Sequence, residues 1–291
     1  MNRPVRQLLI IILAPGLLCS PALPRTTAAE GKQLPEILER VGERVLFYHD
    51  GLTNIICTEV VRQQDLNSLM APEGRPREWV YEFKIVRQPG ESGATIREMR
   101  EVKLVDGKPP EKNHRPKCTD PESASGSPLR FLLPKDRADY SFSIAGNEDL
   151  QGVPALVIAF APARLDPPKA EWKGSCFRIS AQKKGRIWVN PKTYDVIQVE
   201  MQLTGPVEFK SPRVSRTGIF WKMGASRKLA LKKSDTTIRF RQVVFSDPDQ
   251  VLLLPESRES VTVIEGARTP RFRTLTNYSN YRRFVGEIKL R

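Results

Sequence analysis

The chain has 291 residues, of which 40% are hydrophobic and 27% are charged, a composition typical of a globular protein. Its formal net charge is +14, and a basic surface favours anionic partners such as acidic lipid headgroups, polyanions or nucleic acid, although it also serves solubility alone. The longest apolar run, residues 8–18, is too short to cross a bilayer, which argues against an α-helical membrane protein.

Residues 1–29 have the features of a secretory signal peptide. A start with two Arg residues precedes the apolar run 8–18, and small residues allow cleavage after Ala22 or after Ala29. The two Leu residues before Cys19 do not fit a lipid-modification site, so we expect no lipid anchor there. The sequence therefore predicts a periplasmic or secreted protein that meets oxidising conditions.

Residues 34–49 form the only long helix that the sequence predicts. Apolar side chains recur at steps of three and four residues, with Glu and Arg between them. Pro35 suits a first helical turn, and Asp50-Gly51 ends the pattern. One face of this helix is thus expected to pack against the rest of the chain.

Strand signals dominate from residue 54 onward. The strand predicted at 77–86 places four large apolar side chains on one face, namely Trp79, Tyr81, Phe83 and Ile85. The other predicted strands cover 54–63, 95–105, 138–146, 153–162, 176–182, 185–190, 195–203, 235–246, 251–264 and 271–284, with a less regular segment at 206–224.

The stretch "GRIWVNPKTYDVIQVEMQL", residues 185–203, predicts a hairpin whose second strand alternates. One face carries Ile197, Val199, Met201 and Leu203, and the other carries Val196, Gln198, Glu200 and Gln202. A period of two means that one face is buried and one is wet.

Short turns between the strands predict antiparallel pairing in a meander. Long surface loops are expected at 106–130 and 163–175, with a helical turn around 127–133. A twisted sheet of this size must curl. The fold class predicted is therefore mainly β (α+β): a single domain over residues 30–291, with a large curved antiparallel meander wrapped around the N-terminal helix.

Export leaves three cysteines, which permit one disulfide and one free thiol. Counting turns along the meander places Cys118 and the loop before Cys176 at the same end of the sheet, so we predict a Cys118–Cys176 disulfide with Cys57 buried and free. No Cys-x-x-Cys pair or His cluster is present, and His49 and His114 stand alone. We expect no metal site and no cofactor.

Sequence motifs for catalysis are missing. The chain has no Gly-x-Ser-x-Gly elbow, no phosphate loop and no dinucleotide fingerprint. The alternation of Arg with Phe and Tyr in 271–284 could stack bases, but export makes a nucleic-acid partner an unfavourable interpretation. We predict that the protein is not an enzyme, while a hydrolase built from residues far apart in the chain stays an alternative.

The order of signal peptide, amphipathic helix and strand meander resembles the outer-membrane lipoprotein carrier (LolA/LppX-like) superfamily, in particular a secreted bacterial branch. Gly185, Trp188, Asn190 and Thr193 match its middle hairpin, and Leu252–Pro255 is similar to its late strand. The resemblance covers most of residues 33–290. It implies an unclosed β-barrel, plugged by helices on its concave side, that holds acyl chains, with relatives that bind lipid or lipoprotein or sense envelope stress through a partner.

The sequence thus predicts an exported, non-catalytic binding protein for a hydrophobic or acylated ligand, a lipid or lipoprotein, and no nucleic-acid partner. An anionic ligand and peripheral contact with an anionic membrane fit the basic charge. The candidate lining residues are Trp79, Tyr81, Phe83, Ile85, Ile197, Val199, Met201 and Leu203. The alternative is an interaction or sensor module of the envelope that takes no small ligand.

Overall fold

The computed structural model describes residues 28–52, 54–88, 95–111, 128–173, 176–210, 228–246, 249–266 and 270–284. Its helices are α1 (Ala28–Gly51), η1 (Arg130–Leu132) and α2 (Pro134–Arg137). Its strands are β1 (Ile55–Leu66), β2 (Pro72–Gln88), β3 (Thr95–Val105), β4 (Tyr140–Leu150), β5 (Val153–Pro162), β6 (Lys169–Lys173), β7 (Cys176–Ser180), β8 (Lys183–Val189), β9 (Val196–Leu203), β10 (Val207–Lys210), β11 (Lys228–Ser246), β12 (Asp249–Glu265) and β13 (Arg271–Arg283).

The predicted N-terminal helix is confirmed, but α1 begins at Ala28, so Pro35 lies inside it instead of in its first turn. The apolar stripe packs inward as the spacing requires. Its buried side chains are Leu38, Val41, Val45 and Tyr48. No helix in the described ranges combines the length and apolarity that a membrane span needs.

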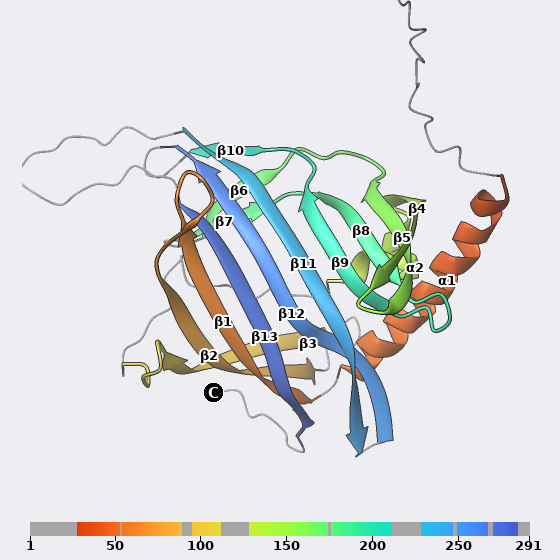
Figure 1. Ribbon diagram of the computed structural model, residues 1–291, viewed down its shortest axis with the longest axis horizontal. Coiled ribbons are helices and arrows are strands. Elements are labelled where there is room, and N and C mark those ends of the chain that lie inside the picture. Colours follow the sequence, from red (N-terminus) through yellow and green to blue (C-terminus); the bar gives the residue numbers. More distant parts are fainter. Residues whose placement is uncertain are drawn as a thin grey trace, which may run out of the picture.

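Eleven antiparallel strands form one curved sheet that does not close on itself, which confirms the predicted fold class (Figure 1). Ten of them follow the order β3-β2-β1-β13-β12-β11-β9-β8-β5-β4, and β10 pairs with β11. The largest break in the chain order is the pairing of β1 with β13 across more than 200 residues, from Ile55 with Arg283 to Asp65 with Phe272. Two smaller breaks occur where β11 pairs with β9 and β8 pairs with β5. The two free edges are therefore β3 and β4, which follow each other in the chain.

The last strand joins the two halves of the sheet. On one side β13 pairs with β1 of the group β1–β3, and on the other it pairs with β12 of the group β4–β12. β6 and β7 form a separate two-stranded hairpin. The sequence predicted a strand at β7 only, because the Pro-rich run 163–175, which contains β6, indicated a loop. A strand as short as β6, five residues long, gives little alternation to detect.

A short helical segment between β3 and β4 packs beside α1. We call residues 129–137 the plug; they comprise η1, α2 and the buried Leu129 and Leu133. The predicted helical turn around 127–133 is thus confirmed. Phe131 of the plug stacks on Phe160 of β5 with ring centroids 4.2 Å apart. The plug and α1 together cover one half of the concave face.

Candidate functional site

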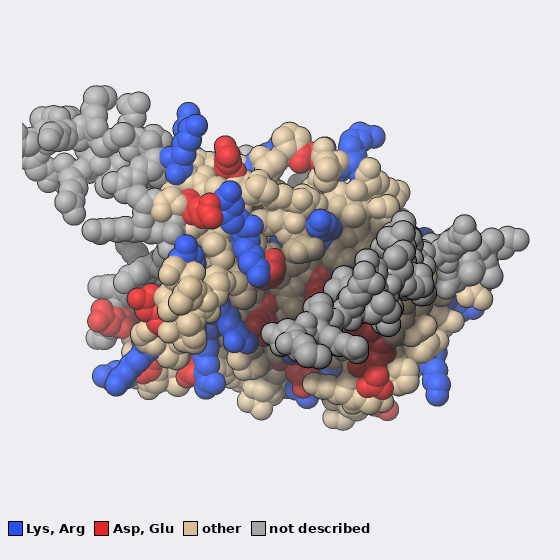
Figure 2. All heavy atoms as spheres, turned by 45° about the horizontal axis from the view of Figure 1, so that its top comes forward, with Lys and Arg blue, Asp and Glu red and all other residues tan. Residues whose placement is uncertain are grey.

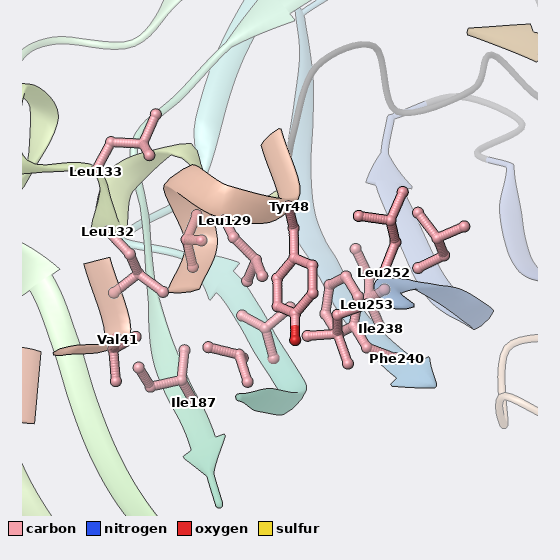
Figure 3. Close-up of a cluster of buried hydrophobic side chains, with 14 of the residues drawn as sticks. Val41, Tyr48, Leu129, Leu132, Leu133, Ile187, Ile238, Phe240, Leu252 and Leu253 are labelled. Carbon is pink, nitrogen blue, oxygen red and sulfur yellow. The ribbon is translucent and has the colours of Figure 1, made fainter. Parts of the chain in front are cut away.

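The apolar half of the concave face is filled by the protein's own side chains. Ile187 is fully buried, and side chains from α1, the plug and the sheet meet there in one cluster. Figure 3 shows Val41, Tyr48, Leu129 and Leu132 gathered with Ile187, Ile238, Phe240 and Leu252. A ligand can reach this half only if α1 or the plug moves.

Seven of the eight predicted lining residues have their side chains on the concave face. Phe83, Ile85 and Val199 are buried in the apolar core, and Met201 packs against it. Trp79 and Tyr81 are buried in a second cluster with Val61, and Leu203 is buried in a third with Val207 and Leu231. Their role in holding a ligand stays a prediction.

Ile197 lies on the opposite face from the one predicted. The pairing of β8 with β9 shifts by one residue between Trp188 and Val189, so a β-bulge interrupts the alternation. Val196 is therefore buried in the concave core, whereas Ile197 packs with Trp188 and Val157 in a cluster on the outer face. A strict period of two, which the sequence suggests, does not hold across a bulge.

Charged side chains that are buried or partly buried lie beyond the apolar half. The carboxylate of Glu59, 2% exposed, accepts a hydrogen bond from Arg100 Nε at 2.6 Å. Arg100 also lies 3.6 Å from Glu98 and 3.9 Å above the ring of Phe83. We call Glu59, Glu98, Arg100, Lys183 and Arg258 the concave charge cluster.

Two cations of this cluster have no ion pair with any described residue. The Nε of Arg258 is buried without a hydrogen-bond partner in the described part of the chain. Burial lowers the pKa of Arg258, and burial together with the nearby Arg258 charge lowers the pKa of Lys183. Asp235 raises the pKa of Lys183, but its carboxylate already holds Lys233 at 3.1 Å.

A second polar network fixes α1 to the sheet. The buried carboxylate of Asp195 accepts hydrogen bonds from Arg44 Nε at 3.0 Å and Tyr48 Oη at 2.7 Å, both on α1. It also accepts from Thr193 Oγ1 at 2.9 Å and Gln242 Nε2 at 3.1 Å. Burial, followed by the hydrogen bond to Asp195, raises the pKa of Tyr48 well above its usual range. This network, which we call the helix latch, satisfies the buried charge from several sides.

The β8–β9 turn places Thr193 and Asp195 for this latch. The Oδ1 of Asn190 accepts from the backbone N–H groups of Lys192 at 2.9 Å and Thr193 at 3.3 Å, which is the usual action of Asn in a turn. Tyr194 adopts a φ of 61°, and the chain then enters β9. The motif that carries the family resemblance thus has structural roles here.

Glycine is required where β8 and β9 approach each other. A Cβ added to Gly185 would lie 1.8 Å from the carbonyl oxygen of Glu200. On the outer face of the same hairpin, Trp188 Nε1 donates to Glu148 at 2.8 Å. The close approach of the two strands at Gly185 and the Trp188–Glu148 hydrogen bond fix the position of the β8–β9 hairpin.

The sheet splits beside this hairpin. β9 pairs with β11 over four residues only, and the pairing ends at Met201 with Thr236. A pocket of about 620 Å³ lies there, and a second pocket of about 570 Å³ shares Gln202 and Asp235 with it. We call these two adjoining pockets the sheet split. Neither is lined by a residue of α1.

The free thiol at Cys57 agrees with the prediction that this cysteine is buried and unpaired. Burial raises its pKa to about 12. Cys118 lies outside the described residues, and the side chain of Cys176 is likewise not described, so their disulfide stays a prediction. Within the described ranges, no group of three or more His, Cys, Asp or Glu could hold a metal ion.

The sequence did not reveal the concave charge cluster. Along β1, both alternating sets contain apolar residues, so the pattern does not show that Glu59 points inward. The hint that was present is that Glu98 and Arg100 share the face of the buried Phe83 and Ile85 through the pairing of β3 with β2. That pairing becomes visible only once the register is known.

The basic charge of the chain does not gather into one patch on the face shown in Figure 2. Lys and Arg side chains there alternate with Asp and Glu. Ion pairs at the surface of the molecule include Arg273 with Glu259 at 2.8 Å and Arg186 with Glu200 at 3.1 Å. The positive charge on this face is therefore spread out among negative charges.

No family model and no curated protein sequence matches the chain. It aligns with solved structures of a DUF1329 family protein from Desulfovibrio piger (TM-score 0.43, 11% identity, 89% of this chain and 95% of that one) and of a putative outer membrane lipoprotein-sorting protein domain from Vibrio parahaemolyticus (0.39, 14%, 87% and 94%). A third is a LolA superfamily protein from Nitrosomonas europaea (0.35, 13%, 88% and 95%). The structural neighbours thus include the group that the sequence resembles, at a level that does not establish a shared function.

Proposed function

We propose that this chain is an exported, non-catalytic binding protein that holds a hydrophobic or acylated ligand, a lipid or lipoprotein, on the concave side of its unclosed sheet. We also propose that residues 30–291 act as one domain, since a single sheet contains strands from both ends of this range. The observation that carries the proposal is that an apolar concave face is covered by one helix and a nine-residue plug, beside two cations, Lys183 and Arg258, that make no ion pair with a described residue.

The driving force would be burial alone. Each methylene of an acyl chain that leaves water contributes about 0.8 kcal/mol. The ligand must replace the contacts that α1 or the plug makes with the sheet, so part of this free energy offsets their displacement. Displacement of α1 would have to break the packing of its apolar stripe and the polar latch on Asp195.

The filled core favours a second candidate, an envelope interaction or sensor module without a small ligand. Val41 and Ile187 are fully buried on opposite sides of the interface between α1 and the sheet. A platform that never opens would have the same packing. The two candidates differ in whether the purified protein carries an amphiphile.

Native mass spectrometry of the protein purified from the periplasm of a bacterial host, followed by solvent extraction, separates these candidates. The proposal expects about one amphiphile per chain, which the extraction releases and which rebinds to the delipidated protein. A chain that is free of amphiphile as isolated, and that binds neither a fatty acid nor a lysophospholipid afterwards, contradicts the proposal and supports the module.

A further inference from the structure

We propose that the sheet split, together with Lys183 and Arg258, is the seat of one oxyanion, the carboxylate or phosphodiester headgroup of the ligand. This inference rests on the proposed function. It adds where the polar headgroup of the ligand binds, which the proposed function does not specify. Three observations lead to it: the charge balance, the shared face of the cations, and the position of the split.

The concave charge cluster holds one more cation than it has carboxylates. Arg100 contacts both acidic groups, Glu59 at 2.6 Å and Glu98 at 3.6 Å. Neither carboxylate lies within ion-pair distance of Lys183 or Arg258 in the described chain. A buried charge without a close partner is costly, and one bound monoanion would remove that cost.

The two unpaired cations share the concave face. Arg258 pairs directly with Ile238, whose side chain is in the apolar core. Lys183 precedes Ile187 by four residues on β8 with no bulge between them, so the period of two puts both on one face. The charge of Arg258 is also one of the causes that lower the pKa of Lys183, after burial, which agrees with this shared face.

The sheet split borders both the apolar core and the outer face, next to Lys183 in the chain, although neither Lys183 nor Arg258 is among the residues that line its two pockets. Phe160 and Met201 line its larger pocket, and both belong to the apolar core or pack against it. Lys184, Glu200 and Gln202 also line the pocket, and the alternation along β8 and β9 puts them on the outer face. An acyl chain in the core could therefore leave its headgroup at the split.

Lys184 adds a further hydrogen-bond donor at the sheet split. It lines the larger pocket, its side chain is exposed, and it makes no ion pair with a described residue. Lys and Arg bind oxyanions through charge-assisted hydrogen bonds, which are about twice as strong as neutral ones. Two carboxylates also line this pocket, but each has a cationic partner, since Arg186 lies 3.1 Å from Glu200 and Lys233 lies 3.1 Å from Asp235. Lys184 is therefore available for a carboxylate or phosphate.

The test compares three probes on the full mature chain: a 16-carbon fatty acid, its methyl ester, and inorganic phosphate. Affinities are measured by displacement of a fluorescent fatty acid and by calorimetry. Charged hydrogen bonds predict that the wild type binds the acid about tenfold more tightly than the ester. The double variant Lys183→Gln, Arg258→Gln should bind both equally, close to the affinity of the wild type for the ester.

Matched variants separate loss of charge from loss of structure. Arg273→Gln removes an exposed Arg on the neighbouring strand β13 and should keep the full preference for the acid. Arg258→Lys keeps the charge and should keep most of the preference. If the double variant does not show the wild-type circular dichroism spectrum, Lys183→Gln alone provides the same comparison.

The outcomes distinguish this inference from the proposed function. Equal binding of acid and ester by the wild type, or a preference that survives in the double variant, overturns the headgroup seat while the proposed function stands. Binding of neither long-chain probe overturns both. Competition of inorganic phosphate with the acid in the wild type, but not in the double variant, supports a site for the oxyanion itself. Binding of phosphate without binding of the acid would indicate a site for a free anion and would overturn the headgroup assignment.

Discussion

The two halves of the concave face differ in how they are closed. The half under α1 and the plug is a continuous apolar core, fastened at its edge by the helix latch on Asp195. The half around Glu59 and Arg258 holds charges as well, and among the described residues Lys183 and Arg258 have no carboxylate within ion-pair distance. The first arrangement stabilises the fold, whereas the second leaves two cations without an ion pair in the described part of the chain. By this comparison, the apolar half mainly stabilises the fold, and the charged half is the part that the proposed headgroup site uses.

Truncation in the apolar half should give the largest loss of stability. Ile187→Ala removes a fully buried side chain between α1 and the sheet and should lower the free energy of unfolding by about 4 kcal/mol. Urea unfolding followed by tryptophan fluorescence measures it. Val244→Ala, at a side chain that is 71% exposed on β11, should change stability by less than about 0.5 kcal/mol. Equal effects at both sites would mean that the apolar half is not tightly packed.

The helix latch should come next. Asp195→Ala leaves the Tyr48 hydroxyl and the Gln242 amide without their acceptor and should cost about 3 kcal/mol. Hydrogen exchange should show that the amides of α1 lose protection more than those of β11. The control is Asp249→Ala, an exposed carboxylate at the β11–β12 turn. Unchanged protection of α1 would show that its apolar stripe alone holds it.

Alkaline pH should weaken the protein through its buried acids. Burial raises the pKa of Cys57 to about 12, whereas an unfolded thiol titrates near about 8.5. The unfolded chain therefore releases this proton first, so the contribution is present below about pH 8.5 and is lost as pH rises toward 12, by up to about 1.4 kcal/mol per unit.

Unfolding free energies at pH 8, 9 and 10 measure this loss. Cys57→Ala should show a flatter dependence over that range, although its stability at pH 8 is lower. The raised pKa values of Tyr278 and Tyr281, which burial also causes, extend the same sign above pH 10. Rapid labelling of Cys57 by a thiol reagent in the native protein at pH 8 would contradict the assignment.

Substitution of Arg258 should have the smallest effect on stability. Arg258→Met replaces a cation that makes no ion pair with a described residue with an apolar side chain of similar length, so the free energy of unfolding should change by less than about 1 kcal/mol or increase. Arg100→Met, which leaves Glu59 buried and unpaired, should cost about 3 kcal/mol. A large loss for Arg258→Met would mean that Arg258 has a structural role, and the two halves would then be alike.

The sequence predicts local structure better than it predicts the site. The stripe of α1 and the alternation in β2 follow from neighbouring residues, and both are confirmed. The bulge that turns Ile197 outward depends on the register of β8 with β9. The concave charge cluster depends on how β1 and β3 pair with β2 and how β12 pairs with β11. These registers join residues that are distant in the sequence, so a short stretch of sequence does not predict them.

The position of β13 has a consequence for how the molecule is made. Since the described strands β1–β3 meet the remaining sheet only through this strand, a growing chain holds two unjoined pieces with open edges until β13 has been made. Removal of β13 would therefore divide the sheet in two.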